Sequence, residues 1–168
     1  TMLAEARRDA LRGKSLLVVG AGYERKRFIF ERAKELGLEI VLVDLPGSAA
    51  ADLAGEFIVA DTRDREKAVR TVLEELDKRG LREDLAGITS FWEDDLELTA
   101  MLAERLGLSY APLSAASAAR DKLATRARME AAGLPVPVYR RIHSRADLAA
   151  ALEDAPLPAI LKPARSAG

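Results

Sequence analysis

The chain has 168 residues, enough for one compact domain or for one domain and the start of another. Hydrophobic residues make up 49% and charged residues 32%, which excludes collagen-like, low-complexity and disordered classes. With 26 Lys and Arg against 27 Asp and Glu, no overall basic field attracts nucleic acid or an anionic membrane. The absence of Cys and the single His143 exclude a disulfide framework, a thiolate zinc site and a multi-histidine metal cluster.

Neither a membrane span nor a targeting signal is visible in the sequence. The longest apolar runs, such as residues 16–19 and 40–43, are far shorter than the roughly 20 residues that a bilayer requires. Residues 1–12 lack the long apolar core of a secretory signal. We therefore expect a cytoplasmic protein that binds neither a membrane nor nucleic acid.

Short β-branched runs alternate with segments whose apolar residues stand three and four apart, which is typical of a βαβ protein with a parallel sheet. The predicted strands cover residues 15–20, 39–44, 56–60 and 86–91. The predicted helices cover residues 2–11, 24–36, 64–79 and 94–106. Because the strands are apolar throughout, both faces of the sheet should be buried. We predict an α/β fold, an open and mostly parallel sheet with helices on both faces.

A change to Ala and Ser around residues 112–117 marks a domain boundary, which we place between residues 1–113 and 114–168. The second region should contain two helices and two strands. A capping box that begins at Ser144 opens the second helix. The predicted helices cover residues 121–132 and 144–152, and the predicted strands cover residues 136–142 and 157–162. The chain ends in a small-residue loop, so we expect it to be a fragment of a longer protein.

Two glycines follow the first predicted strand. Gly20 and Gly22 stand where a turn opens the next helix, and Asp44 ends the second strand. This is similar to part of a dinucleotide fingerprint, in which glycines admit a pyrophosphate and an acid binds a ribose hydroxyl. Arg25 replaces the third glycine, so a plain tight turn is the alternative. An NAD-binding domain of an oxidoreductase stays open as a second hypothesis.

An acidic run follows the fourth strand, at the edge where open α/β sheets bind ligands. Trp92, the only tryptophan, is followed there by Glu93, Asp94 and Asp95. Acids at this edge are suited to orient an amino group or a cation. The alternative is structural, because Ser90 and Glu93 have capping-box spacing and acids at a helix start favour the helix dipole.

Two lysines are candidates for binding phosphate. Lys122 lies in the first turn of a predicted helix, where a cation opposes the helix dipole and a bound phosphate would explain it. Lys162 ends the last predicted strand, just before Pro163 and the small-residue loop. Taken alone, each lysine is more often a solvated surface residue, and His143 is best interpreted as a loop residue.

Three segments together occur in the order and spacing of the ATP-grasp superfamily. They are Arg-Asp-Lys at 120–122, Gly-Leu-Pro-Val-Pro at 133–137 and Leu-Pro-Ala-Ile-Leu-Lys-Pro at 157–163. The resemblance covers the whole chain and implies a Rossmann-like pre-ATP-grasp domain over 1–113. It implies a linker helix and the first, α+β part of the nucleotide-binding domain over 114–168. Phe-Trp-Glu-Asp at 91–94 is similar to the carnosine-synthase-like and L-amino-acid ligase branch.

The resemblance implies an ATP-dependent carboxylate–amine ligase that acts through an acyl phosphate, with ATP and Mg²⁺ as cofactors. Its substrates would be small-molecule carboxylates and amines, amino-acid-like in character, and a homodimer is left open. The residues assigned to ATP are Lys122, Lys162, Ser166 and Gly168. The residues assigned to the substrate, by their place at the sheet edge, are Gly20, Gly22, Trp92 and Glu93.

The chain departs from the superfamily pattern. Ser166 stands where many relatives have the first glycine of the phosphate-covering loop. The acidic magnesium ligands, the catalytic residues and the arginine that supports the transition state are expected outside these residues. We therefore predict that this fragment alone does not catalyse. A third hypothesis treats residues 13–113 as a docking domain for substrates or subunits, without a site of its own.

Overall fold

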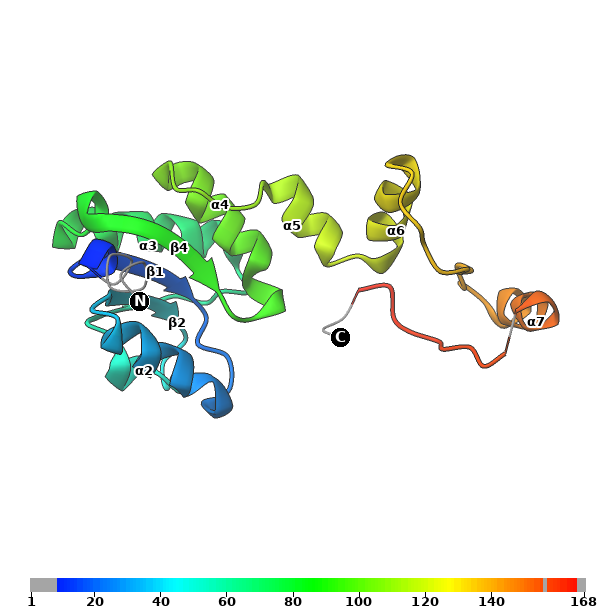
Figure 1. The fold of residues 1–168 in the computed structure, drawn as a ribbon, viewed down its shortest axis with the longest axis horizontal. Coiled ribbons are helices and arrows are strands. Elements are labelled where there is room, and N and C mark those ends of the chain that lie inside the picture. The colour runs from blue at the N-terminus through cyan, green and yellow to red at the C-terminus, as the bar shows by residue number, and fades with distance from the viewer. Residues whose placement is uncertain (1–8, 156, 166–168) are drawn as a thin grey trace. The chain divides into compact units, whose positions relative to one another are not determined.

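The computed structural model describes residues 9–155 and 157–165. The chain divides into two compact units, with the boundary between Ala116 and Ser117. Each unit is described by itself. The first unit holds the sheet, and the second holds helices joined by extended segments (Figure 1).

The first unit is built on a four-stranded parallel sheet with the order β3-β2-β1-β4. Its strands are β1 (Ser15–Val19), β2 (Glu39–Asp44), β3 (Glu56–Val59) and β4 (Leu85–Ser90). Each predicted strand of this region is therefore confirmed to within a residue or two. Because all four strands run in the same direction, their carboxyl ends lie along one edge of the sheet.

Helices cover both faces of this sheet, as predicted. They are α2 (Arg27–Glu35), α3 (Arg65–Arg79) and α4 (Leu96–Leu106), with short 3₁₀ turns η1 (Glu24–Lys26), η2 (Ala51–Leu53), η3 (Arg82–Asp84) and η4 (Glu93–Asp95). α2 lies on one side, and α3 packs beside α4 on the other (Figure 1). Residues 9–11 of the predicted N-terminal helix are helical, and residues 2–8 lie outside the described residues.

Alternation along the strands divides the core into two layers. In β1, Val18 faces the cluster that contains Phe30 of α2, whereas Leu17 faces the cluster that contains Val72 of α3 and Leu98 of α4. Successive side chains of a strand point to opposite faces, so a strand buried on both sides must be apolar at every position. The five residues of β1 meet this requirement with only Ser15 polar.

The second unit contains two helices that the sequence pattern predicts, and a third helix, which it does not predict, crosses the boundary between the units. α6 (Lys122–Ala131) and α7 (Arg145–Asp154) match the predicted helices. The capping box of α7 is confirmed, since Asp147 N–H donates to Ser144 Oγ and Ser144 N–H donates to Asp147 Oδ2. α5 (Leu113–Ala119) occupies the predicted boundary, where only a change of composition was noted. In the part of the chain that the structure describes, no helix is long and apolar enough to span a bilayer.

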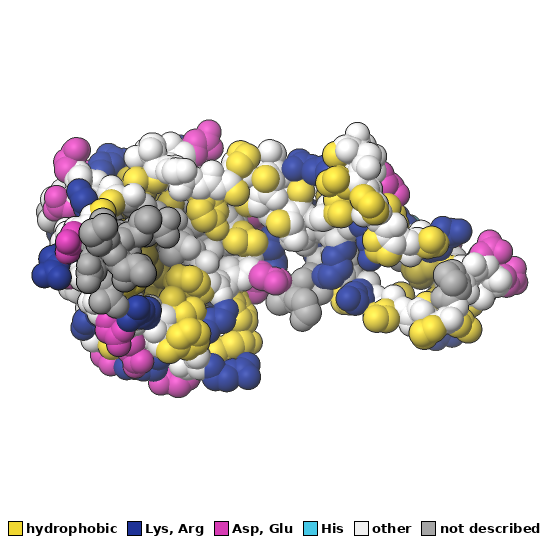
Figure 2. Space-filling model, viewed as in Figure 1, with side chains coloured by type: hydrophobic (Ala, Val, Ile, Leu, Met, Phe, Trp, Pro, Cys, Tyr) yellow, Lys and Arg dark blue, Asp and Glu magenta, His cyan; other side chains and the backbone are white. Residues whose placement is uncertain are grey.

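The two strands predicted for the second unit are wrong. Residues 136–142 and 157–162 have no strand assignment, and no strand occurs among residues 117–155 and 157–165. Val138 and Ile160 are 71% and 79% exposed, and Figure 2 shows hydrophobic side chains on the surface of this unit. A strand exists only through hydrogen bonds to a neighbouring strand, and the described residues of this unit supply none. The strand-like sequence is therefore left extended and unpaired.

Candidate functional site

The first unit offers a candidate site at the carboxyl edge of its sheet. The Gly20–Gly22 turn follows β1, Asp44 ends β2, and the acidic run follows β4. β1 lies between β2 and β4, so these three segments are neighbours. In open α/β sheets, ligands bind outside this edge.

The Gly20–Gly22 turn is held by carboxylates of the protein itself. Gly20 and Gly22 have φ of 73° and 71°, in the left-handed region that glycine adopts without strain. Ala21 N–H donates to Asp44 Oδ2 at 2.9 Å, and Ser48 Oγ donates to the same oxygen at 2.7 Å. In the dinucleotide hypothesis a turn N–H faces pyrophosphate and the acid faces ribose. Here the turn N–H of Ala21 and the carboxylate of Asp44 hydrogen-bond to each other, which disfavours an NAD site.

Trp92 lies against the glycine turn, so the structure brings these two predicted site elements together. A Cβ on Gly22 would lie 3.6 Å from Trp92 Cε3. The rings of Tyr23 and Trp92 meet edge to face with centroids 4.6 Å apart. Lys26 Nζ lies 5.2 Å from the centroid of the Trp92 ring and donates to the Phe91 carbonyl. The result is an aromatic and cationic wall beside the turn.

Glu93 is exposed at this edge in the first turn of η4, so the helix-dipole alternative stays open, whereas the capping-box alternative is wrong. Ser90 belongs to β4, and its hydroxyl lies 3.4 Å from Tyr110 Oη. The 3₁₀ turn that precedes α4 starts after Trp92, and no side-chain hydrogen bond caps it. Ser90 and Glu93 therefore form no capping box, despite their spacing.

Asp95 is a residue of this edge that the sequence pattern missed. Its side chain is only 4% exposed, whereas Glu93 and Asp94 are exposed. Burial raises the pKa of Asp95 to about 6, while a hydrogen bond from Thr62 acts in the opposite direction. Three consecutive acids at a helix start look alike in a sequence, so no signal separated the buried one from its neighbours.

The second unit brings together the segments that carry the two predicted phosphate-binding lysines. Lys122 N–H donates to the Ala164 carbonyl at 2.9 Å, and Arg165 Nε lies 3.2 Å from Asp121 Oδ2. Residues 163–165 therefore lie against the start of α6. Asp121 also accepts hydrogen bonds from Leu123 N and Ala124 N, so the helix N–H groups are already satisfied. Any phosphate here would be bound by lysine side chains rather than by the helix N-terminus.

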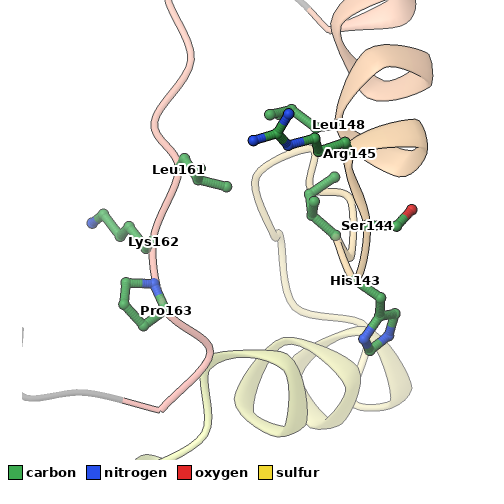
Figure 3. A pocket seen from close by; sticks show the side chains of 8 residues that line it. His143, Ser144, Arg145, Leu148, Leu161, Lys162 and Pro163 are labelled. Atoms are coloured by element: carbon green, nitrogen blue, oxygen red, sulfur yellow. The ribbon is translucent and has the colours of Figure 1, made fainter.

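A cavity of about 530 Å³ lies in the second unit between the start of α7 and the extended segment that ends at Pro163. It is lined by Ile142, His143, Ser144, Arg145, Leu148, Leu161, Lys162 and Pro163. Leu161 is directed toward Leu148 of α7, whereas the Lys162 side chain extends away from that helix (Figure 3). Alternation along the extended backbone separates the two side chains. Ser166 and Gly168, also assigned to ATP, lie outside the described residues.

The donor set of the described residues suits a polyphosphate better than a metal. No group of three or more His, Cys, Asp or Glu side chains that could hold a metal ion occurs within residues 9–155 and 157–165. Lysine ammonium groups are point charges that bind phosphate oxygens. The residues shown thus fit a nucleotide phosphate chain and supply no magnesium cage of their own.

Known proteins and a protein family are similar to this chain. Residues 30–109 match the ATP-grasp N-terminal domain. The chain is 36% identical to human carnosine synthase 1 over an alignment that covers 96% of this chain and 21% of that protein. The chain thus spans about a fifth of the length of this relative.

Solved structures of ligases share the fold. The L-amino acid ligase from Bacillus licheniformis is 28% identical with a TM-score of 0.71, over 92% of this chain and 38% of that one. An N5-carboxyaminoimidazole ribonucleotide synthetase solved with ADP is 25% identical with a TM-score of 0.65, over 88% of this chain and 37% of that one. Residues 30–109 thus match an ATP-grasp N-terminal domain, and most of the chain is similar to carnosine synthase in sequence and to L-amino acid ligase in fold.

Proposed function

We propose that this chain is the N-terminal part of an ATP-dependent carboxylate–amine ligase. The observation that carries the proposal is the main-chain hydrogen bond of 2.9 Å from Lys122 to Ala164. It holds the segment after Lys162 against the helix that begins with Lys122, so the backbone segments that carry the two lysines lie side by side. The similarity to carnosine synthase and L-amino acid ligase supports the same class of reaction.

In the proposed reaction, ATP supplies the phosphoryl group that turns a carboxylate into an acyl phosphate, which an amine then attacks. Lys122 and Lys162 bind the phosphate chain by charge. Asp121, whose pKa is held below its usual range chiefly by the Ala124 N–H and the Arg165 side chain, stays ionised and keeps α6 capped. Magnesium would neutralise the transferred oxygens, with ligands outside the residues described.

The sheet edge of the first unit is the proposed substrate side. Gly20 and Gly22 form the turn at this edge with positive φ, and the Trp92 ring forms a wall beside Gly22. The exposed Glu93 carboxylate is placed to hold the ammonium group of an amino-acid-like substrate. We place this activity in the cytoplasm.

The test uses the natural protein that contains these residues. ADP release is measured with pairs of amino acids, for the parent protein and for Lys162→Met. We expect the parent protein to release ADP only when both amino acids are present. In Lys162→Met the rate should fall by about 100-fold, because one preorganised charge that stabilises the phosphate is lost. Lys78→Met is the matched control, because Lys78 is exposed in the first unit and should leave the rate unchanged. Equal rates in both variants would contradict the assignment of Lys162.

The 168-residue chain alone provides a second test. We expect no ADP release from it, because the described residues contain no cluster of magnesium ligands. ATP-dependent ADP release by the pure chain would overturn this expectation.

A further inference from the structure

The 3₁₀ turn η1 brings two side chains of the first unit to the same place. Lys26 N–H donates to the Tyr23 carbonyl at 2.8 Å, which closes the turn. Because a 3₁₀ helix has three residues per turn, side chains three positions apart lie one above the other. Tyr23 and Lys26 accordingly both contact the ring of Trp92. The turn thus presents one aromatic ring and one ammonium group to the segment that follows β4.

The ammonium group of Lys26 joins this turn to the end of β4. Its Nζ donates to the Phe91 carbonyl and lies 5.2 Å from the centroid of the Trp92 ring. Phe91 is itself anchored, since its ring meets Phe30 of α2 edge to face with centroids 6.2 Å apart. A carbonyl oxygen and an aromatic face attract a cation but carry no net charge. Loss of the ammonium group would therefore leave no charge unpaired at these two contacts.

The two glycines of the turn after β1 make room for groups of the protein itself. A Cβ on Gly20 would overlap Asp95 Oδ2. A Cβ on Gly22 would lie 3.1 Å from Lys26 Cδ, which is tighter than ordinary van der Waals contact, and 3.6 Å from Trp92 Cε3. The space that glycine leaves at position 22 is therefore filled by the Lys26 stem and the Trp92 ring.

The Trp92 ring is thus held by three side chains. Tyr23 meets it edge to face, Lys26 lies over it, and Asp94 Oδ2 accepts its Nε1–H at 3.1 Å. Tyr23 and Lys26 come from the turn after β1, and of these two Lys26 also binds the main chain beside Trp92. None of these four side chains is part of the two buried clusters, so their contacts lie outside the packing that stabilises the sheet.

We propose that Lys26 is a positioning residue, which holds the Trp92 ring at the carboxyl edge of the sheet for contact with a substrate. A binding site is precise only when the groups that touch the ligand are fixed by other residues. Without the ammonium group the indole ring is free to turn away from Gly22, and the wall beside the turn is lost. That the ring contacts an amino-acid-like substrate rests on the proposed function, whereas the hold of Lys26 on the ring does not.

Acrylamide quenching tests this hold without a substrate, because Trp92 is the only tryptophan of the 168-residue chain. Lys26→Met keeps the side-chain stem and removes the ammonium group. The displaced ring should become about 2- to 5-fold more populated, as for loss of one exposed cation–π contact, and the quenching constant should rise. Lys26→Arg restores a cation and should be quenched as the parent is. Lys34→Met, at an exposed lysine of α2, is the matched control and should also equal the parent.

Two glycine variants test the same hold by a second route. Gly22→Ala places a Cβ against the Lys26 stem and the Trp92 ring, so it should raise the quenching constant as Lys26→Met does. Gly47→Ala is the matched control, since its φ of 80° is as strained but no described atom lies within 4 Å of its Cβ position. This pair decides the question if Lys26→Met does not fold. Quenching that is unchanged in Lys26→Met, or equal in the two glycine variants, would overturn the proposal.

The natural protein tests what this position means for the proposed reaction. In steady-state ADP release, Lys26→Met should raise the KM for an amino acid by up to the same factor of about 2 to 5, because the binding-competent ring is less populated. The kcat should stay unchanged, since the wall binds substrate and transition state alike. A lower kcat with an unchanged KM would overturn the role in substrate binding. If no pair of amino acids releases ADP, the proposed function fails, and the quenching result stands by itself.

Discussion

Hydrophobic residues make up about half of each unit of this chain, but the two units bury them differently. In the first unit, the apolar stretches of β1 and β2 lie between helices, so Leu17 and Leu42 are fully buried. In the second unit, Leu161 is equally apolar but remains 70% exposed. The difference teaches that strand-like sequence folds as a strand only where neighbouring strands are present to pair with it.

The largest expected effect tests this contrast with one substitution made in each unit. Leu17→Ala should lower the free energy of unfolding of the first unit by about 2 to 5 kcal/mol, through lost burial and the cavity it leaves. Leu161→Ala should change the free energy of unfolding of the second unit by less than about 0.5 kcal/mol. Urea unfolding followed by Trp92 emission measures the first effect, and amide exchange of α6 and α7 measures the second. A large effect of Leu161→Ala would show that the second unit has a core after all.

The next effect concerns the pH dependence of the first unit. Because burial raises the pKa of Asp95 from 3.8 to about 6, the stability associated with its protonated form is present below pH 3.8 and lost as the pH rises through 6. This amounts to about 3 kcal/mol at most. Asp95→Asn should therefore gain stability over the parent as the pH rises, in urea unfolding at several pH values. Asp94→Asn is the exposed control, and a constant difference for Asp95→Asn would refute the burial argument.

A third substitution separates backbone strain from crowding within the first unit. Gly80 has φ of 66° with no atom near its missing Cβ, so Gly80→Ala should cost about 1 kcal/mol from φ alone. Gly20→Ala adds the overlap with Asp95 and should cost about 2 kcal/mol or more. Thermal unfolding of both variants gives the comparison. The added cost should shrink in the Gly20→Ala, Asp95→Ala double variant, because the overlapping group is removed.

The smallest expected effect comes from removing a helix cap in each of the two units. Asp64 caps α3 by accepting Lys67 N–H at 3.3 Å, and Asp64→Ala should cost the first unit about 1 kcal/mol. Ser144→Ala removes the capping box of α7 and should leave unfolding of the first unit unchanged. Amide exchange of α7 should nevertheless become faster in Ser144→Ala. Coupled loss of both units in either variant would mean that they unfold together.

Local signals predicted most of what the structure shows. Ser144 marks the start of a helix through backbone groups close in sequence, and it caps α7 where the sequence predicted. The strands of the first unit were predictable because continuous apolar runs are distinctive. Lys122 and Lys162 were placed by spacing to a known superfamily, and the structure joins their segments through Ala164.

The features that the sequence failed to predict depend on contacts between residues far apart in the sequence. The Asp95 side chain lies against Gly20 and Thr62, which precede it by 75 and 33 residues in the sequence. The spacing of Ser90 and Glu93 predicts a capping box, but hydrogen bonding to β1 keeps Ser90 in the sheet. Pairing partners and burial are properties of the whole fold, which local pattern does not contain.

The single carboxylate of Asp44 has a consequence for any attempt to redesign this sheet edge. It accepts hydrogen bonds from Ala21 N, Leu45 N and Ser48 Oγ, and so joins the end of β2 to the turn after β1. A designer who wished to install a dinucleotide cofactor here would have to free Asp44 and remove Asp95 in the same step. Since either change alone leaves a carboxylate against the turn, no single substitution leads from this edge to a dinucleotide site.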